Sequence, residues 1–327
     1  MSEKPLGKSN LELVEECDSF PYIQDNPLYY KSYVSSTFYE FRINGCPKIL
    51  GYIPIELVEK FSWAESAWKL VERKEGESGT LTLMSPEDAT ADERTALLDE
   101  TLQAARNTFK VLMGKGWRNE KYPIYIPGTT QLLASIERSA ACLFGLPTWG
   151  IHLTAFTKKD GQLLIWVPRR SATKSTFKGM LDNSVAGGMA TGETPFECML
   201  REAEEEASLE QKVAKNAIPV GVLSYVYVRD PRAGGETGLL QPELEHVYDL
   251  PLSPEITLKP KDGEVEMFTL MTVEEVISEM RQGNFKPNCA VVIIDFLIRH
   301  GFIRAEDEKD YEEICSRLHR RLGYPNI

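Results

Sequence analysis

The segment GGMATGETPFECMLREAEEEASL, residues 187–209, concentrates carboxylates in one short run. If this run is helical, at about 100° per residue, Glu202, Glu205 and Glu206 share one face. Like charges this close repel one another, and a shared divalent cation would remove that repulsion. Mg²⁺ prefers oxygen ligands and is commonly held by a few carboxylates together with substrate phosphates. The spacing therefore indicates a candidate metal site, with a solvated charged helix face as the alternative.

An apolar stripe lies beside the acidic face on the same helical projection. Its members are Phe196, Met199, Leu200, Ala203 and Ala207. Glu204 projects away from the other glutamates. The acidic face is therefore expected at the edge of the core rather than in open solvent, a position that suits a functional cluster.

The residues around the cluster follow the longer pattern G-x5-E-x7-R-E-A-x-E-E-x-S-L. This pattern resembles the Nudix box, G-x5-E-x7-R-E-U-x-E-E-x-G-U, in which U is apolar. Gly187 and Gly188 allow backbone geometries that other residues cannot adopt. Ser208 departs from the pattern, which has Gly there, so a less permissive backbone is expected at the helix end. The matching residues are Gly187, Glu193, Arg201, Glu202, Ala203, Glu205, Glu206 and Leu209.

The resemblance implies a loop–helix–loop that holds a divalent metal ion, Mg²⁺ or alternatively Mn²⁺. Such enzymes hydrolyse a diphosphate linked to another moiety. By the match, Glu202, Glu205 and Glu206 are the expected metal ligands, and Glu205 and Glu206 are also catalytic. Glu193 and Arg201 would brace the loop against the helix through an ion pair.

Two further groups are candidates for the attack of water on a diphosphate. The reaction needs the phosphate charge neutralised and the water oriented. Arg169 and Arg170, at the end of a predicted strand, could grip phosphate, with a solvated basic loop as the alternative. Glu264, in the segment KDGEVEMF, is the expected general base because it is nearest the loop and so better placed than Glu266 to reach over the metal helix. The alternatives are Glu266 and a charge at the strand edge that faces solvent.

Segments outside the box are similar to one subgroup of this family. LDNSVAGG, DGEVEMF, GNFKPNCAVVIIDFLIRHGFI, FPYI and GYIP are similar to fungal and plant Nudix hydrolases related to thiamine pyrophosphokinase. That resemblance covers most of the chain. It implies hydrolysis of thiamine diphosphate, or of its oxidised oxo and oxy analogues, to the monophosphate. The alternatives are a Nudix diphosphatase acting on ADP-ribose, a dinucleotide or coenzyme A, and a non-catalytic Nudix binding module.

The elements that must position these groups fall into two predicted units. Residues 1–145 are expected to form a smaller mixed α/β domain. Its predicted elements are a hairpin over 37–54, a helix over 55–72, a strand over 79–85, a helix from the capping box of Thr90 and Glu93 to about Met113, and a helix over 135–145.

Residues 146–327 are expected to form a Nudix α/β/α sandwich with a mixed sheet and C-terminal helices, so the fold class is α/β (α+β). A hairpin should join 151–157 to 163–168. Three more strands are predicted over 217–230, 244–252 and 264–271. Helices should begin at the capping box of Thr272 and Glu275, cover 287–301 up to Gly301, and close the chain at roughly 310–321.

The overall composition sets limits on the partners. The 327 residues carry 37 basic and 49 acidic side chains, for a net charge of -12. An acidic surface repels nucleic acid and anionic membranes, so a small-molecule diphosphate is the expected partner, with the oligomeric state left open. The six cysteines are widely spaced, without a CxxC pair, which argues against zinc and for reduced thiols. With neither a signal-peptide core nor an apolar run of about 18 residues, a cytoplasmic protein is expected.

Overall fold

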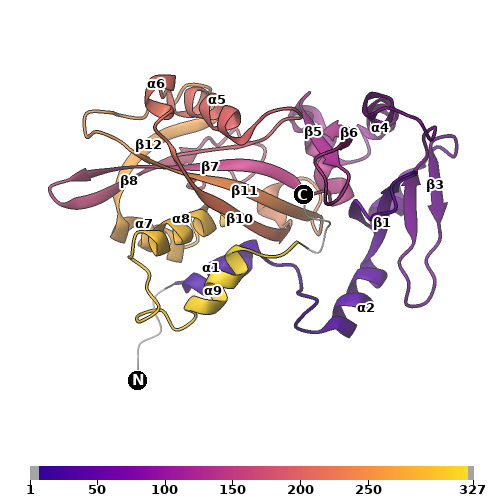
Figure 1. The fold of residues 1–327 in the computed structure, drawn as a ribbon, viewed down its shortest axis with the longest axis horizontal. Coiled ribbons are helices and arrows are strands. Elements are labelled where there is room, and N and C mark those ends of the chain that lie inside the picture. Colours follow the sequence, from indigo (N-terminus) through magenta and orange to yellow (C-terminus); the bar gives the residue numbers. More distant parts are fainter. Residues whose placement is uncertain (1–6, 323–327) are drawn as a thin grey trace.

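The computed structural model describes residues 7–322, and its strands form three sheets within that range. The largest is a six-stranded mixed sheet in the order β10-β11-β7-β8-β12, with β9 also paired to β7 (Figure 1). Only the pairing of β11 with β7 is parallel among these described strands. The strands are β7 (Thr148–Lys159), β8 (Gln162–Arg170), β9 (Val185–Gly188), β10 (Ile218–Val228), β11 (Leu240–Pro251) and β12 (Val265–Thr272).

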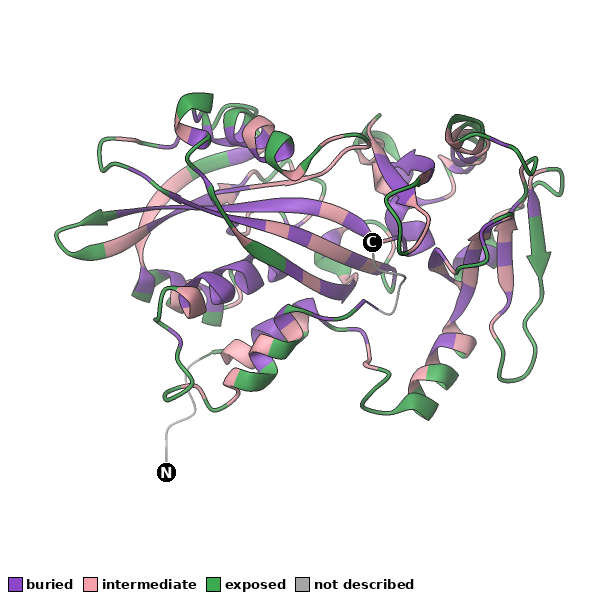
Figure 2. Cartoon of the chain, in the orientation of Figure 1, coloured by how far each residue is buried: buried purple, intermediate pink, exposed green. Residues whose placement is uncertain are grey.

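Helices cover both faces of this sheet. On one face lie α5 (Pro195–Ala207) and α6 (Gln211–Ala214), and on the other lie α7 (Val273–Arg281) and α8 (Pro287–Arg299) (Figure 1). Figure 2 shows that the middle of the sheet and the inner sides of α5 and α8 are buried. The expected α/β/α sandwich with a mixed sheet is therefore confirmed. Between residues 7 and 322, no helix has the length and apolarity needed to cross a bilayer.

A smaller mixed α/β region precedes the sandwich and has its own hydrophobic core. It contains a four-stranded sheet in the order β2-β1-β4-β3 and a separate two-stranded sheet of β5 and β6. Its strands are β1 (Phe38–Ile43), β2 (Gly51–Pro54), β3 (Trp68–Val71), β4 (Thr80–Leu83), β5 (Lys121–Tyr125) and β6 (Leu132–Glu137). Its helices are α2 (Pro27–Thr37), α3 (Ile55–Lys60) and α4 (Ala91–Ala105), with 3-10 turns at Lys110–Leu112, Gly114–Gly116 and Arg138–Phe144.

Several local predictions are confirmed. The hairpin over 37–54 is present as antiparallel β1 and β2. Thr90 and Thr272 both form the predicted capping boxes, at the start of α4 and α7. Helix α8 ends before Gly301, which has a φ of 74°. These features depend on neighbouring residues, so the sequence carries them locally.

Three predicted helices in the N-terminal region are wrong in extent. The helix over 55–72 ends at Lys60, because Trp68–Val71 pairs as β3 with β4 and that pairing overrides the helical spacing. The helix from Thr90 ends at Ala105 rather than near Met113. The helix over 135–145 is the end of β6 followed by a 3-10 turn, although Gly145, with a φ of 57°, does stop it.

The helix α1 (Asn10–Cys17) packs with the sandwich rather than with the N-terminal sheet. Leu13, Val14 and Cys17 join the core beneath the six-stranded sheet, together with α8 and the helix α9 (Tyr311–Leu318). Next to α1, the buried carboxylate of Asp18 accepts a hydrogen bond from Arg320 Nη1 at 2.8 Å. This helix is an exception to the division of the chain at residue 145, a boundary that stays a prediction.

Candidate active site

Helix α5 carries the acidic segment and is held at its start by the sequence itself. Thr194 caps the helix in a reciprocal capping box with Glu197, and Pro195 occupies its first turn. Met199, Ala203 and Ala207 are fully buried against the sheet, as the helical projection predicted. Two stripe members lie further out: Phe196 is 39% exposed and Leu200 is half-buried. Glu204 points outward, where its Oε1 accepts a hydrogen bond from Lys261 Nζ at 3.1 Å.

Ser208 ends α5 in the left-handed conformation, with φ 54° and ψ 28°. This is the conformation that favours Gly, which explains why the Nudix pattern has Gly there. A side chain in this region costs roughly 1–2 kcal/mol. The departure at Ser208 therefore leaves the turn intact but strained.

We expect Ser208→Gly to raise the free energy of unfolding by about 0.5–1 kcal/mol, since relief of the strain exceeds the entropy that a glycine loses on folding. Urea denaturation of the two proteins measures the difference. Ser208→Ala is the matched control, because it removes the hydroxyl but keeps the Cβ atom. An equal gain from both variants would contradict the backbone explanation.

Arg201 links the loop before α5 to the helix. Its Nε and Nη2 donate to the two carboxylate oxygens of Glu193 at 2.8 and 3.0 Å. Its Nη1 donates to Glu202 at 2.8 Å and to Glu205 at 3.2 Å. Glu193 also accepts from the backbone N–H of Ala190 at 3.2 Å. Because Arg201 is committed to these three carboxylates, it fixes the relative positions of the loop and the acidic face.

Gly187 and Gly188 are needed for close approach rather than for unusual backbone torsions. Neither of these two described glycines has a φ in the left-handed region. A Cβ atom at Gly187 would lie 2.0 Å from Glu202 Oε1, and one at Gly188 would lie 1.6 Å from the hydroxyl of Tyr122. Glu202 can therefore lie against β9 only because residue 187 has no side chain.

The three predicted ligands on α5 differ in exposure. Glu202 and Glu206 are buried, with 8% and 7% of their surface exposed, whereas the side chain of Glu205 is 51% exposed. Glu206 accepts a hydrogen bond from the backbone N–H of Ala186 at 3.1 Å. Burial raises the pKa of Glu206 above the usual carboxyl range, although Lys174 Nζ, 3.8 Å away, acts in the opposite direction. Burial also raises the pKa of Glu202.

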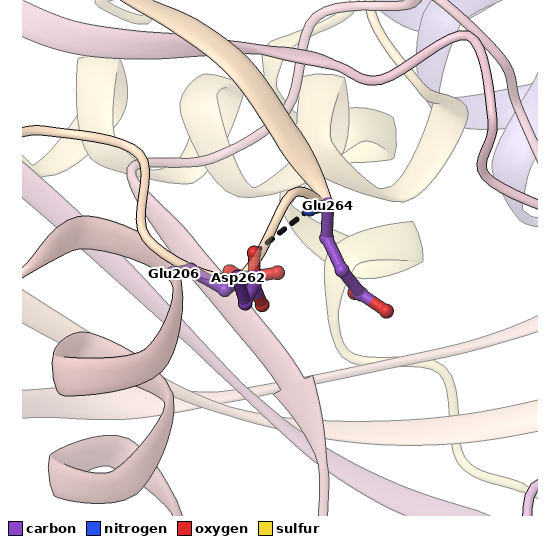
Figure 3. Close-up of side chains that lie close together, drawn as sticks. All are labelled: Glu206, Asp262 and Glu264. Atoms are coloured by element: carbon purple, nitrogen blue, oxygen red, sulfur yellow. Dashed lines mark hydrogen bonds between the residues drawn. The ribbon is translucent and has the colours of Figure 1, made fainter.

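A second group of carboxylates meets Glu206 from the loop before β12. Glu206, Asp262 and Glu264 each present one oxygen within 4.8 Å of the others. Figure 3 shows the three side chains and the elements that carry them. The backbone N–H of Glu264 donates to Asp262 Oδ1 at 2.8 Å. Lys259 anchors this loop to α5, because its N–H donates to the carbonyl of Ala207 at 3.2 Å. Three convergent carboxylates fit a hard divalent cation.

These carboxylates line a cleft of about 620 Å³ that both regions of the chain enclose. Lys174 enters it from the loop between β8 and β9, and its ammonium contacts the carboxylate of Glu264. Elsewhere in the cleft, Glu243 and Glu245 on β11 share the hydroxyl of Tyr225, at 2.6 and 3.0 Å. The cleft thus contains two separate groups of acidic side chains.

The structure separates the two arginines predicted to grip phosphate. Arg170 lines the cleft, but its guanidinium pairs with Asp182 and also donates to the carbonyls of Thr176 and Phe177. Arg169 donates to the carbonyl of Gly179 at 2.8 Å and is not among the described residues that line the cleft. Lys174, in the loop that follows this strand, contacts Glu206 and Glu264 instead.

Sequence reasoning missed several cleft residues. Asp262 stands in a Lys-Asp-Gly turn, and no local signal connects it to α5. Glu243 and Glu245 did carry a signal, because alternate residues of a strand share a face. Glu264 lines the cleft as expected, whereas Glu266 is exposed and lies outside the lining that the described residues form.

Comparison with known proteins identifies two families along the chain. The NUDIX domain matches residues 148–290, and a domain of unknown function (DUF4743) matches residues 12–148. Uncharacterized protein YJR142W of Saccharomyces cerevisiae is 40% identical over 243 residues, which cover 72% of this chain and 70% of that protein. Nudix hydrolase 20, chloroplastic, of Arabidopsis thaliana is 37% identical over 246 residues, which cover 74% of this chain and 60% of that protein.

Among solved structures, DR0079 from Deinococcus radiodurans is 23% identical, with a TM-score of 0.38, over 51% of this chain and 91% of that one. The match to the NUDIX domain carries the assignment, and the Arabidopsis Nudix hydrolase aligns with 74% of this chain. The matched NUDIX region contains the whole acidic segment, the braced loop and the carboxylates before β12. The chain belongs to the Nudix hydrolases, a family of enzymes that hydrolyse diphosphate bonds.

Proposed function

We propose that the protein is a Mg²⁺-dependent diphosphatase that converts thiamine diphosphate, or its oxo and oxy analogues, to the monophosphate. The observation that carries the proposal is the pairing of two acidic groups in one cleft. Glu206, Asp262 and Glu264 suit a metal-bound diphosphate, and Glu243 and Glu245 suit a cationic group on the rest of the substrate. The resemblance of the flanking segments to thiamine-related Nudix hydrolases supports this choice.

The carboxylates that would hold Mg²⁺, or alternatively Mn²⁺, are Glu206, Asp262 and Glu264, with Glu202 and Glu205 beside them on α5. A divalent ion bound there supplies Lewis-acid polarisation of the phosphoryl oxygens and lowers the pKa of a bound water. The role of Arg201 is to hold Glu202 and Glu205 in place.

The protein's own side chains account for the remaining steps. Water attacks the terminal phosphorus, the bridging P–O bond breaks, and the products are the monophosphate and orthophosphate. Glu264 accepts the proton that the attacking water loses. The ammonium of Lys174, which is 11% exposed, neutralises phosphoryl oxygens beside Glu206. Arg170 supports the same loop through its bonds to Thr176 and Phe177.

The cleft also offers surfaces that suit a flat, cationic heterocycle. Trp149 lines it, and aromatic faces attract cations. The side chains of Glu243 and Glu245 add negative charge, and Glu245 is 5% exposed. A thiazolium or an amino-substituted ring therefore finds both kinds of partner in this cleft.

A panel of diphosphates tests the proposal. The purified protein with Mg²⁺ is given thiamine diphosphate, its oxo and oxy analogues, ADP-ribose, a dinucleotide and coenzyme A, and product formation is measured. We expect the highest kcat/KM for a thiamine form and no turnover when the metal is chelated. Faster cleavage of ADP-ribose, a dinucleotide or coenzyme A would favour the nucleotide diphosphatase, and metal-independent binding without turnover would favour a binding module.

Metal affinity should rise with pH through the neutral range. The pKa of Glu206 is raised by burial, so below that pKa a proton occupies the carboxylate and competes with the ion. As the pH rises through the raised pKa, the carboxylate ionises and the affinity increases. Calorimetric titration of the protein with Mn²⁺ at several pH values measures this trend. Glu206→Gln should weaken binding and flatten its pH dependence; an unchanged slope in that variant would contradict the assignment.

The proposed setting is the cytosol. All six cysteines are free thiols, and five of them are buried. Unpaired thiols of this kind are typical of a reducing compartment. The partner we propose is a small molecule rather than nucleic acid or a membrane.

A further inference from the structure

We propose that Arg118, from the N-terminal region that matches a domain of unknown function, binds the phosphate of the substrate in the Nudix cleft. The inference rests on the proposed diphosphatase function, and it gives the N-terminal region a role in substrate binding. Arg118 lies between the second 3-10 turn and β5, well outside the matched NUDIX segment. It nevertheless lines the same cleft as Glu202, Glu206 and Glu264.

The N-terminal region is fixed to the loop that begins the acidic helix. Thr191, four residues before α5, donates its backbone N–H to the carbonyl of Lys121 on β5 at 2.8 Å. Its hydroxyl lies 3.0 Å from that of Ser135 on β6. Figure 1 shows β5 and β6 between the two larger sheets, beside the segment that leads into α5. The hairpin therefore holds the metal-binding helix and Arg118 in one rigid arrangement.

Two further contacts join the N-terminal region to loops of the sandwich around the cleft. Glu236, in the connection between β10 and β11, accepts the backbone N–H groups of Lys110 and Val111 at 2.6 and 3.0 Å. Arg118 itself donates from Nη2 to Ser175 Oγ at 2.9 Å, next to Lys174. The two regions thus meet at separate points around the cleft, and the side chain of Arg118 bridges one of them.

The position of Arg118 suits an anion bound beside the carboxylates. Its Nη1 is 3.9 Å from Glu264 Oε1, and 34% of its side chain is exposed. A guanidinium presents a planar fork that binds two phosphate oxygens at once. Since Glu264 belongs to the candidate metal group, a diphosphate held by that group would place its oxygens within reach of Arg118.

The other guanidinium groups of the cleft are committed to acceptors within the protein. Arg170 pairs with Asp182, Arg201 with Glu193 and Glu202, and Arg229 with Gln241 and two carbonyls. Arg138 pairs with Glu120 at 2.8 Å. By contrast, among residues 7–322 the side chain of Arg118 makes one hydrogen bond, to the neutral hydroxyl of Ser175, and a longer contact with Glu264. Arg118 is therefore the guanidinium that would break the weakest existing contacts when it binds a substrate.

The test compares three variants of the full chain, Arg118→Met, Arg118→Lys and Arg94→Met. The last is the matched control, since Arg94 on α4 donates to Ser85 and lies away from the cleft lining. Calorimetry measures the binding of methylenediphosphonate, whose P–C–P bridge resists hydrolysis, in the presence of Mn²⁺. The binding of Mn²⁺ alone and the thermal unfolding midpoint are measured on the same samples.

We expect Arg118→Met to weaken methylenediphosphonate binding by about 10–100-fold, as for the loss of a charge-assisted, two-pronged contact. Mn²⁺ alone should bind equally well or more tightly, because a positive charge near Glu264 is removed. The affinity of Arg118→Lys for methylenediphosphonate should lie between those of Arg118→Met and the wild-type protein. Arg94→Met should bind it as tightly as the wild-type protein. The same pattern should appear as a raised KM in substrate hydrolysis.

Wild-type affinity for methylenediphosphonate in Arg118→Met would overturn the inference. Parallel losses of diphosphonate binding, Mn²⁺ binding and thermal stability would also overturn it, because they indicate a structural role. A wild-type protein that does not bind methylenediphosphonate would overturn it as well. Failure of the proposed function looks different. In that case no thiamine form is hydrolysed, while Arg118→Met still weakens diphosphonate binding selectively.

Discussion

Replacing Glu206 by glutamine is expected to lower kcat by at least ~10²–10³-fold at saturating Mg²⁺, which corresponds to several kcal/mol of lost transition-state stabilisation. The amide keeps the shape of the side chain and can still accept the hydrogen bond from Ala186. It loses the negative charge that joins α5 to Asp262 and Glu264 in the candidate metal group. Steady-state release of phosphate from the best substrate of the panel measures the effect.

The matched control is Glu204→Gln on the same helix. Glu204 points away from the cleft to Lys261, so this variant should retain nearly full activity. Thermal unfolding separates a loss of chemistry from a loss of fold. Because a buried carboxylate is costly to ionise, the thermal unfolding midpoint of Glu206→Gln without metal should be no lower than that of the wild-type protein. Near-normal turnover of Glu206→Gln would remove Glu206 from the metal site.

The second large effect is expected for Glu264→Gln, which should slow turnover by roughly 10²–10⁴-fold, the usual contribution of acid–base catalysis. The carboxylate belongs to the residue just before β12; it contacts Lys174 and Arg118 and lies close to Glu206. A glutamine there cannot accept the proton of the attacking water. The loss should therefore persist when Mg²⁺ is raised to saturation, and kcat at saturating metal is the quantity to measure.

Glu266→Gln is the natural comparison, because Glu266 is two residues further along and exposed. It should change kcat little. Full recovery of Glu264→Gln at high Mg²⁺ would assign Glu264 to metal binding alone, and a loss in Glu266→Gln alone would move the base to that residue. With neither variant impaired, the proton acceptor would be sought among the glutamates of α5.

The parts of the site that could be predicted from the sequence are those encoded by neighbouring residues. Thr194, Glu197 and the apolar stripe of α5 define a helix and its buried face within one segment. Glu193 and Arg201, which form an ion pair, are eight positions apart, so the sequence alone predicts their contact.

The parts that could not be predicted depend on where distant segments meet. Asp262 reaches Glu206 only because its loop folds back over the end of α5, and nothing in the Lys-Asp-Gly turn encodes that path. Arg118 lies in a different region of the chain from the carboxylates that it faces. Likewise, Trp68 lies in β3 because this segment pairs with β4, although the spacing of the apolar residues around it favours a helix.

The packing of α1 against α8 and α9 has a consequence for the order in which the protein folds during synthesis. The hydrogen bond between Asp18 and Arg320 joins residues 302 positions apart, and the apolar side of α1 shares one core with α9. The N-terminal sheet has its own core and can close while translation continues. Helix α1 leaves the ribosome long before α9, so its apolar face stays uncovered until α9 has emerged. Such long-range contacts slow folding, and the apolar side of α1 remains open to aggregation for as long as α9 is missing.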